Sequence, residues 1–236
     1  STLSSSSAAS DVYKRQLKIT MAITGLFFAL FVVGHMAGNL KLYLPAHDGD
    51  EALDIYGEFL RDLGAPLIPH GHLLWMIRIV LLACVIAHIY GAFALTARSK
   101  QSRGKFKRTN LMGGLDSFAT KTMLVTGAVL LLFIVFHLLD LTMGVQPVAP
   151  EAFVHGEVKA NMIATFSRWP VTIFYVLAMC CLFLHLTHGI RLAASDLGIT
   201  GAKWRQVFVI LAYIIPAVVC IANIVMPLSV ALGWVS

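Results

Sequence analysis

Five of the nine histidines in this chain lie inside long apolar segments, where little water is available to satisfy their ring nitrogens. These five residues are His35, His88, His137, His185 and His188. Ionisable side chains in such segments are costly, and they usually face the interior of a helix bundle, a cavity or a cofactor. An imidazole in that position can relay protons, bind a metal ion or ligate a haem iron. Which of these it does depends on the helices that carry the histidines and on their depth.

The apolar segments are long enough to cross a membrane. The chain has 236 residues, of which 58% are hydrophobic and 13% charged, whereas soluble domains carry about a quarter charged residues. A transmembrane helix needs about 20 apolar residues. Five segments meet this requirement: 18–44, 71–97, 118–144, 168–195 and 204–233. The alternating pattern of a membrane barrel is absent from the sequence, so we predict an all-α integral membrane five-helix bundle.

Lysine and arginine placement predicts the direction of the spans. The stretch 97–108 is the most basic in the chain, whereas 45–70 carries six acidic residues against one arginine. We therefore expect the N-terminus inside and the C-terminus outside. Residues 49–64 have the apolar spacing of a short amphipathic helix on the outer surface. We expect the serine-rich residues 1–17 to be a disordered or non-native tail.

The remaining residues, 18–236, are predicted to form one transmembrane domain without a sustained internal repeat. Counting residues from the charged ends of the spans places His35 and His137 towards the outer side. The same count places His88 and His185 towards the inner side. The histidines thus form two levels, about 10–15 Å apart along the helix axes.

Two imidazoles from facing helices at one depth are what a six-coordinate haem iron requires. Two such pairs predict two b-type haems stacked between the first four helices. His188, one turn beyond His185, is then a supporting or packing residue. The alternatives are a cross-helix hydrogen bond for any single histidine, or a haem-free transporter or proton channel that uses histidines as relays. Relays usually also contain buried carboxylates, and the middle of each span lacks them.

Basic and glycine residues supply further candidates. Haem propionates need cationic partners, and each candidate can equally extend its charge to the membrane surface. These candidates are Arg78 and Arg168 on the outer side, and Lys121 and Arg191 on the inner side. Glycines near the histidines would let a flat macrocycle approach, or would simply let helices pack closely. They are Gly34, Gly38, Gly91 and Gly189.

Several segments resemble a known family. They are "MAITGLFFALFVVGHMAGNLKLYL" (21–44), "LLACVIAHIYGAFALTAR" (81–98), "LLLFIVFHLLDLTMG" (130–144) and "LFLHLTHGIRLAASDLGIT" (182–200). These resemble the cytochrome b membrane anchor of succinate dehydrogenase and quinol:fumarate reductase, in its five-helix, single-polypeptide, two-haem type. The likeness extends over nearly the whole chain from about residue 18.

The resemblance implies a subunit that passes electrons between an iron–sulfur subunit and a membrane quinone, with menaquinone favoured. A flavoprotein subunit would carry the succinate and fumarate chemistry, and both partners would dock on the cytoplasmic face of a bacterial inner membrane. The sequence has no dinucleotide-binding or phosphate-binding motif of its own, and nothing in it indicates a nucleic-acid partner.

The resemblance also implies roles for individual residues. It assigns His88 and His185 to the inner haem and His35 and His137 to the outer haem. The family pattern H-x-x-[N/H]-G selects His185 rather than His188. Some relatives carry a carboxylate two positions before this ligand, where this chain has Phe183. Asp54 and Glu58 are candidates for proton exchange with a quinone. A cytochrome b of a hydrogenase or formate dehydrogenase is an alternative of similar class.

Overall fold

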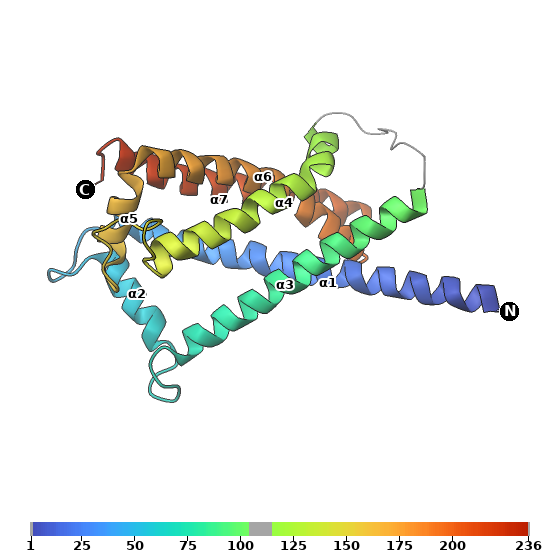
Figure 1. The fold of residues 1–236 in the computed structure, drawn as a ribbon, viewed down its shortest axis with the longest axis horizontal. Helices are drawn as coiled ribbons and strands as arrows, with labels where there is room; N and C mark the ends of the chain where they lie inside the picture. Colours follow the sequence, from blue (N-terminus) through green and yellow to red (C-terminus); the bar gives the residue numbers. More distant parts are fainter. Residues whose placement is uncertain (1, 104–114, 236) are drawn as a thin grey trace.

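The computed structural model describes residues 2–103 and 115–235, and the regular elements of these ranges are helices (Figure 1). Five of them are long and apolar enough to cross a membrane, which confirms the predicted five-helix fold. They are α1 (Thr2–Asn39), α3 (His72–Arg103), α4 (Leu115–His137), α6 (Trp169–Asp196) and α7 (Ala202–Ala231). A helix satisfies its backbone groups internally, which a segment in lipid must do.

The connections alternate between the two ends of the bundle. The N-terminus, the end of α3, the start of α4 and the α6–α7 turn lie at one end, which we call the N-terminal end (Figure 1). The short helices α2 (Ala52–Asp62) and α5 (Val158–Phe166) lie with the C-terminus at the opposite, C-terminal end. This arrangement places residues 97–103, the described part of the basic stretch, and the acidic connection 45–70 at opposite ends of the molecule. Residues 104–108 of the basic stretch lie outside the described residues.

Helix α1 begins earlier than expected. The sequence predicted a tail over residues 1–17, but the described residues 2–17 continue the helix. Tyr13 explains part of this extension because its hydroxyl lies 2.9 Å from that of Tyr90 on α3, and the Arg98 guanidinium lies 4.3 Å from its ring centre. Leu17 is also buried. Once these contacts hold the helix around residues 13–17, each further turn towards the N-terminus forms at little cost in free energy, because helix propagation is easier than nucleation.

Helices α6 and α7 form the most extensive helix–helix contact among the described residues. Ala178, Ala212 and Val219 are almost completely buried there, and their small side chains let the helices approach closely. Helices α3 and α4 are mostly exposed along their apolar surfaces, as Phe93 and Leu132 illustrate. Such surfaces suit contact with lipid or with another apolar partner.

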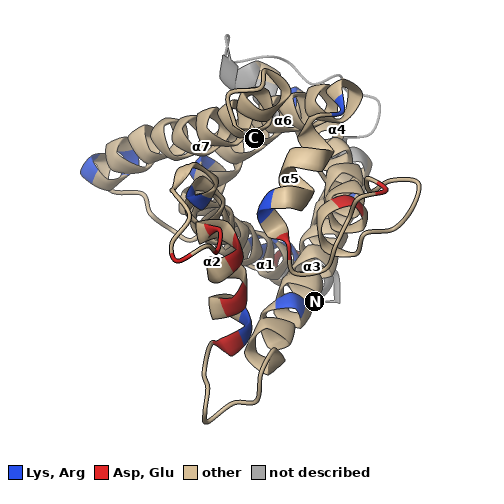
Figure 2. Ribbon diagram, turned by 90° about the vertical axis from the view of Figure 1, so that its left-hand side faces the viewer, with Lys and Arg blue, Asp and Glu red and all other residues tan. Residues whose placement is uncertain are grey.

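The C-terminal end carries the predicted amphipathic helix as α2, and acidic residues gather on it (Figure 2). These side chains connect α2 to its neighbours. Glu51 forms an ion pair with Lys159 of α5 at 3.1 Å, and Asp54 Oδ1 accepts a hydrogen bond from the Lys159 backbone amide at 3.0 Å. Glu58 pairs with Arg61 on α2 itself. Asp54 and Glu58, the two predicted proton-exchange candidates, therefore both have structural partners.

Candidate functional site

Four histidines from four different helices form two facing pairs. The ring centres of His35 on α1 and His137 on α4 are 5.8 Å apart, with an angle of 83° between the ring planes. The ring centres of His88 on α3 and His185 on α6 are 6.3 Å apart, with an angle of 60°. The sequence predicted these two pairs, and the structure brings the same four rings together. His188 lies one turn beyond His185 on α6.

The ring separations fit a shared metal ion. Two imidazole–metal bonds of about 2 Å each, with about 1 Å from each nitrogen to its ring centre, place the centres roughly 6 Å apart. Both observed separations match this value. Within residues 2–103 and 115–235, no group of three or more His, Cys, Asp or Glu is placed to hold a metal. A haem iron is one ion that takes only two axial ligands from the protein.

The two pairs occupy different levels of the bundle. The ring of His88 lies beside Thr24 of α1, eleven residues before His35, and the ring of His185 lies beside Thr126 of α4, eleven residues before His137. Eleven residues of α-helix correspond to about 16 Å. The pairs therefore lie slightly further apart than the sequence predicted. The His88–His185 pair is the one nearer the N-terminal end.

The His88–His185 pair is held by matching contacts on both sides. Thr24 Oγ1 lies 3.0 Å from His88 Nδ1, and Thr126 Oγ1 lies 3.2 Å from His185 Nδ1. Each threonine is followed by a glycine that borders the same ring. A Cβ atom added at Gly25 would lie 3.3 Å from His88 Cε1, and one at Gly127 would lie 3.5 Å from His185 Cε1. Each ring thus lies against a Thr-Gly step of the neighbouring helix.

Gly25 offers a test of this packing. Gly25→Val adds a Cβ in tight contact with the His88 ring and two methyl groups beyond it, so the ring must move away from Thr24. We expect Gly25→Val to destabilise the protein by about 1–3 kcal/mol, the usual cost of overpacking. Gly25→Ala, which needs only a small shift of the ring, should cost less. Thermal unfolding of the purified variants measures this order, and a valine variant as stable as the wild type would contradict it.

A sequence repeat underlies the matching contacts, and the sequence analysis missed it. Residues 20–35 read TMAITGLFFALFVVGH, and residues 122–137 read TMLVTGAVLLLFIVFH. Eight of the sixteen aligned positions are identical, including the threonine, the glycine and the final histidine. Aligning the chain on its histidines would have exposed this signal. Helices α1 and α4 therefore present equivalent groups at both levels.

The repeat also places one phenylalanine beside each histidine of the His35–His137 pair. Phe31 stacks on His35 with ring centres 5.4 Å apart, and Phe133 stacks on His137 at 5.7 Å. These two phenylalanine rings give the His35–His137 pair apolar neighbours. In the described part of the chain, no hydrogen bond to the His35 ring is found, and this ring is the most exposed of the four.

His137 differs from His35 because it joins a buried polar network. Its Nδ1 lies 3.3 Å from the hydroxyl oxygen of Tyr175, which donates to Asp140 Oδ2 at 3.1 Å. The other carboxylate oxygen of Asp140 accepts from Arg168 at 2.6 Å and from Thr165 at 3.2 Å. Because the Tyr175 hydrogen goes to the carboxylate, its oxygen accepts the Nδ1–H of His137. The Nε2 lone pair of that ring is then available to a metal.

The network begins where the helix changes its winding. Residues Leu138–Thr142, directly after His137, form a π-helical turn in which the Met143 amide donates to the Leu138 carbonyl at 2.8 Å. Such turns occur frequently at functional sites. Asp140 lies within this turn and is completely buried. Arg168, predicted as a propionate partner, is thus committed to Asp140 and to the Val148 carbonyl, to which it donates at 2.7 Å.

The other predicted cationic candidates lie towards the ends of the bundle. Arg78 is exposed, stacks on Trp75 at 4.9 Å and lines a cavity of about 660 Å³ beside the α2–α3 corner. Lys121 is exposed near the start of α4, and Arg191 is half-buried near the end of α6. Their role as propionate partners stays a prediction.

The four predicted glycines were candidates either for close helix packing or for the approach of a flat macrocycle. A Cβ added at Gly34 or Gly189 would meet no atom within 4 Å, so both positions border open space beside the histidines. At Gly38 the same atom would lie 2.5 Å from the Tyr56 ring, and at Gly91 it would lie 2.6 Å from Met21. Gly38 and Gly91 therefore serve close packing, whereas a role in admitting a macrocycle stays a prediction for Gly34 and Gly189.

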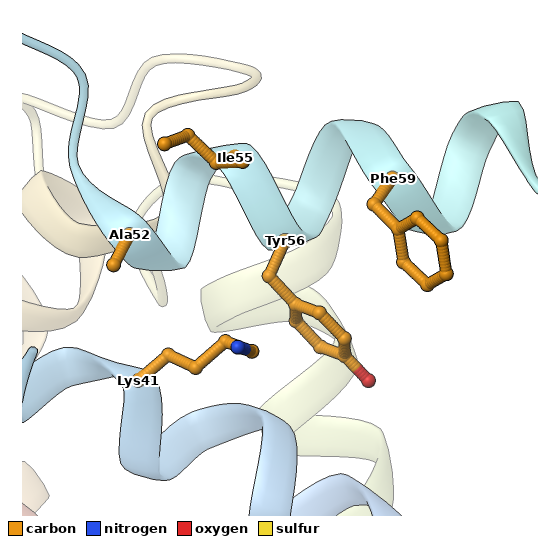
Figure 3. Close-up of a pocket in the computed structure, with 5 residues that line it drawn as sticks. All are labelled: Lys41, Ala52, Ile55, Tyr56 and Phe59. Carbon is orange, nitrogen blue, oxygen red and sulfur yellow. The ribbon is translucent and has the colours of Figure 1, made fainter. Parts of the chain in front are cut away.

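A cavity of about 360 Å³ lies between α2 and the 3-10 turn Leu40–Tyr43 that follows α1 (Figure 3). Its lining residues are Lys41, Ala52, Ile55, Tyr56 and Phe59. The Lys41 amine lies 5.5 Å from the centre of the Tyr56 ring. This ring rests on Gly38, one turn beyond His35. The cavity combines two hydrogen-bond donors with apolar walls, whereas Asp54 and Glu58 are not among the residues that line it.

Comparison with known protein families gives a match. A family model described as "Succinate dehydrogenase/Fumarate reductase transmembrane subunit" matches residues 99–225, more than half of the chain. The matched range contains α4, α6 and the histidines His137 and His185. No curated protein and no solved structure gives a significant match.

Proposed function

Because this chain belongs to the family of transmembrane subunits of succinate dehydrogenase and fumarate reductase, we propose that it is the di-haem electron-transfer anchor of such a complex. Family membership makes it a multi-pass membrane subunit that associates with other subunits of an oxidoreductase. We further propose that the chain binds two haems b and exchanges electrons with a membrane quinone. The observation that carries this proposal is the arrangement of four histidines, one on each of four helices, as two facing pairs.

Each histidine pair would supply the two axial ligands of one haem. His35 and His137 would hold the haem nearer the C-terminal end, and His88 and His185 the haem nearer the N-terminal end. When bound, the haems supply reversible one-electron chemistry. The chain fixes the ring orientations through Thr24, Thr126 and Tyr175, and it walls the sites with aromatic and apolar side chains. Its long helices separate the two sites by about 16 Å, so that they lie near opposite membrane surfaces.

The charge distribution supports an orientation and a docking face. The basic residues near the N-terminal end, such as Arg15, Arg98 and Arg205, favour the cytoplasmic side of a bacterial inner membrane. An iron–sulfur subunit would dock there, together with the flavoprotein that interconverts succinate and fumarate. The C-terminus would then lie on the outer side. This chain lacks motifs for dicarboxylate chemistry in its sequence, so that reaction belongs to the partners.

The cavity between α2 and the turn Leu40–Tyr43 supports a quinone site near the outer pair. A quinone head is a flat apolar ring with two carbonyl acceptors, so it needs apolar walls and hydrogen-bond donors. Tyr56 and Lys41 supply donors, and Ile55 and Phe59 supply apolar surface. Asp54 and Glu58 lie on α2, like Tyr56, but they do not line this cavity. They would therefore exchange protons with a bound quinone only through intervening groups. The family resemblance favours menaquinone as this ligand.

Spectroscopy of the purified chain tests the proposal. After expression with sufficient haem supply, we expect a reduced-minus-oxidised spectrum with the sharp alpha band of bis-histidine haem, and two haems b per chain by pyridine haemochrome assay. A haem-free transporter or proton channel would give no such band, and that result would overturn the proposal. Co-purification with flavin-containing and iron–sulfur subunits is expected. A hydrogenase or formate dehydrogenase partner in their place would contradict the assignment to this complex.

A further inference from the structure

We propose that Thr24 and Thr126 are positioning residues that accept the Nδ1–H of His88 and His185, and so leave the Nε2 lone pair of each ring free for a metal. The inference concerns the residues of this chain, and only the identity of the bound group rests on the proposed function. It extends the site beyond its four histidines to the two helices that border the inner pair.

The hydrogen bonds of each threonine to its own helix support one direction for each contact. A threonine hydroxyl carries one hydrogen, and Thr24 donates it to the Thr20 carbonyl at 2.7 Å, while Thr126 donates to the Thr122 carbonyl at 3.1 Å. With the hydrogen committed to a carbonyl, the hydroxyl oxygen can only accept from the facing ring. In this arrangement the nitrogen that faces the hydroxyl, Nδ1 in both rings, carries the proton.

The neighbouring backbone offers each hydroxyl hydrogen a second acceptor. Thr24 Oγ1 lies 3.3 Å from the Met21 carbonyl oxygen, and Thr126 Oγ1 lies 3.1 Å from the Met123 carbonyl oxygen. A carbonyl oxygen can only accept, so both carbonyls near each hydroxyl favour donation away from the histidine ring. Met21 and Met123 occupy equivalent positions of the repeat, three residues before each threonine.

Burial makes these contacts costly to lose. The side chains of Thr24 and Thr126 are both buried, so water does not readily replace a missing acceptor. Metal-ligating histidines usually donate their second ring nitrogen to such a partner, which fixes both tautomer and ring orientation. Here the partner is a hydroxyl from the adjacent helix, and the repeat supplies it once on each side of the pair.

Valine variants remove the acceptor with little change in shape. We expect Thr24→Val and Thr126→Val each to weaken haem retention at the His88–His185 site by about tenfold, the lower end of the effect of removing such a partner. The double variant should lose most of that haem and keep the haem at His35–His137. The assays are haem content after graded detergent washing and the low-spin EPR signals of the two ferric haems.

Two controls separate positioning from general damage. Thr24→Ser keeps the hydroxyl and should restore wild-type retention and spectra. Thr187→Val removes a buried hydroxyl on α6 that donates to the Phe183 carbonyl at 2.7 Å. Thr24 makes the same kind of hydrogen bond within its own helix, so the two valine variants are comparable. This variant should leave both haem signals unchanged. Loss of both haems in Thr24→Val, or no rescue by serine, would overturn the positioning role.

A measurement on the haem-free protein tests the inference separately from the proposed function. Long-range ¹H–¹⁵N spectra of the apo-protein, labelled at histidine, report which ring nitrogen carries the proton. We expect the Nδ1–H tautomer for His88 and His185 in the wild type, and a shift towards Nε2–H for His88 in Thr24→Val. Wild-type rings with Nε2–H would overturn the inference even if haem binds. A wild type that shows the expected tautomer but takes up no haem would instead remove the proposed function.

Discussion

If the chain holds two haems as proposed, replacing His88 or His185 by leucine is expected to halve the haem content, from two haems per chain to one. Leucine is compatible with a helix and leaves no unpaired polar group, but it cannot ligate iron. Each variant removes one of the two axial ligands of the same site, so the residual spectrum should be identical in both. That spectrum would belong to the haem held by His35 and His137. Pyridine haemochrome assays and EPR of the purified variants measure the outcome.

The combinations of variants test the pairing itself. His88→Leu/His185→Leu should be no worse than either single variant, because both changes affect one site. His35→Leu/His88→Leu should lose both haems because it affects one ligand of each site. His188→Leu is the matched control, since it changes a histidine one turn from His185 on the same helix. Loss of a haem in His188→Leu but not in His185→Leu would contradict the assignment.

The depth of the four histidines was predictable because it depends on counting alone. Charged residues mark the ends of a span, and each helical residue adds a fixed rise, so His35 and His137 fall at one level. Whether the two rings of a pair face one another depends on how each helix is rotated about its axis. The prediction of one shared ligand per pair assumed the right rotation, and only the structure gives it.

The supporting residues were not predicted because their roles depend on contacts between helices. Thr24 reads as an ordinary transmembrane threonine until its distance to His88 is known. Tyr175 lies in a run of apolar residues, and its hydroxyl connects His137 to Asp140 only because α4 and α6 lie side by side with a particular rotation. The π-helical turn adds a residue to the turn after His137, and nothing in the sequence indicates this change in register. The 20–35 and 122–137 repeat was nevertheless present in the sequence.

Arg168→Leu is expected to destabilise the protein by about 3–5 kcal/mol, because it leaves a buried carboxylate without its cation. Asp140 is completely buried, and the Arg168 guanidinium donates to it at 2.6 Å, the shortest of its three hydrogen bonds. Thr165 and Tyr175 supply hydrogen bonds but no compensating charge. In lipid the cost of an unpaired carboxylate is high, so the carboxylate must become protonated or the turn must rearrange. Unfolding of the purified protein in a graded denaturing detergent measures the loss.

A double variant separates the cost of an unpaired charge from the value of the pair. Asp140→Leu/Arg168→Leu should recover most of the lost stability, because replacing both members of a buried ion pair by apolar groups is often neutral. The Arg61–Glu58 pair on α2, which is more exposed, is the matched comparison, and Arg61→Leu should cost at most about 1 kcal/mol. Since Tyr175 donates to Asp140, the double variant frees the Tyr175 hydrogen to turn towards His137. With the two proposed haems bound, the spectrum of the haem at His35–His137 should therefore change while that of the haem at His88–His185 does not. Equal destabilisation by Arg168→Leu and Arg61→Leu would show that the buried network does not depend on its cation.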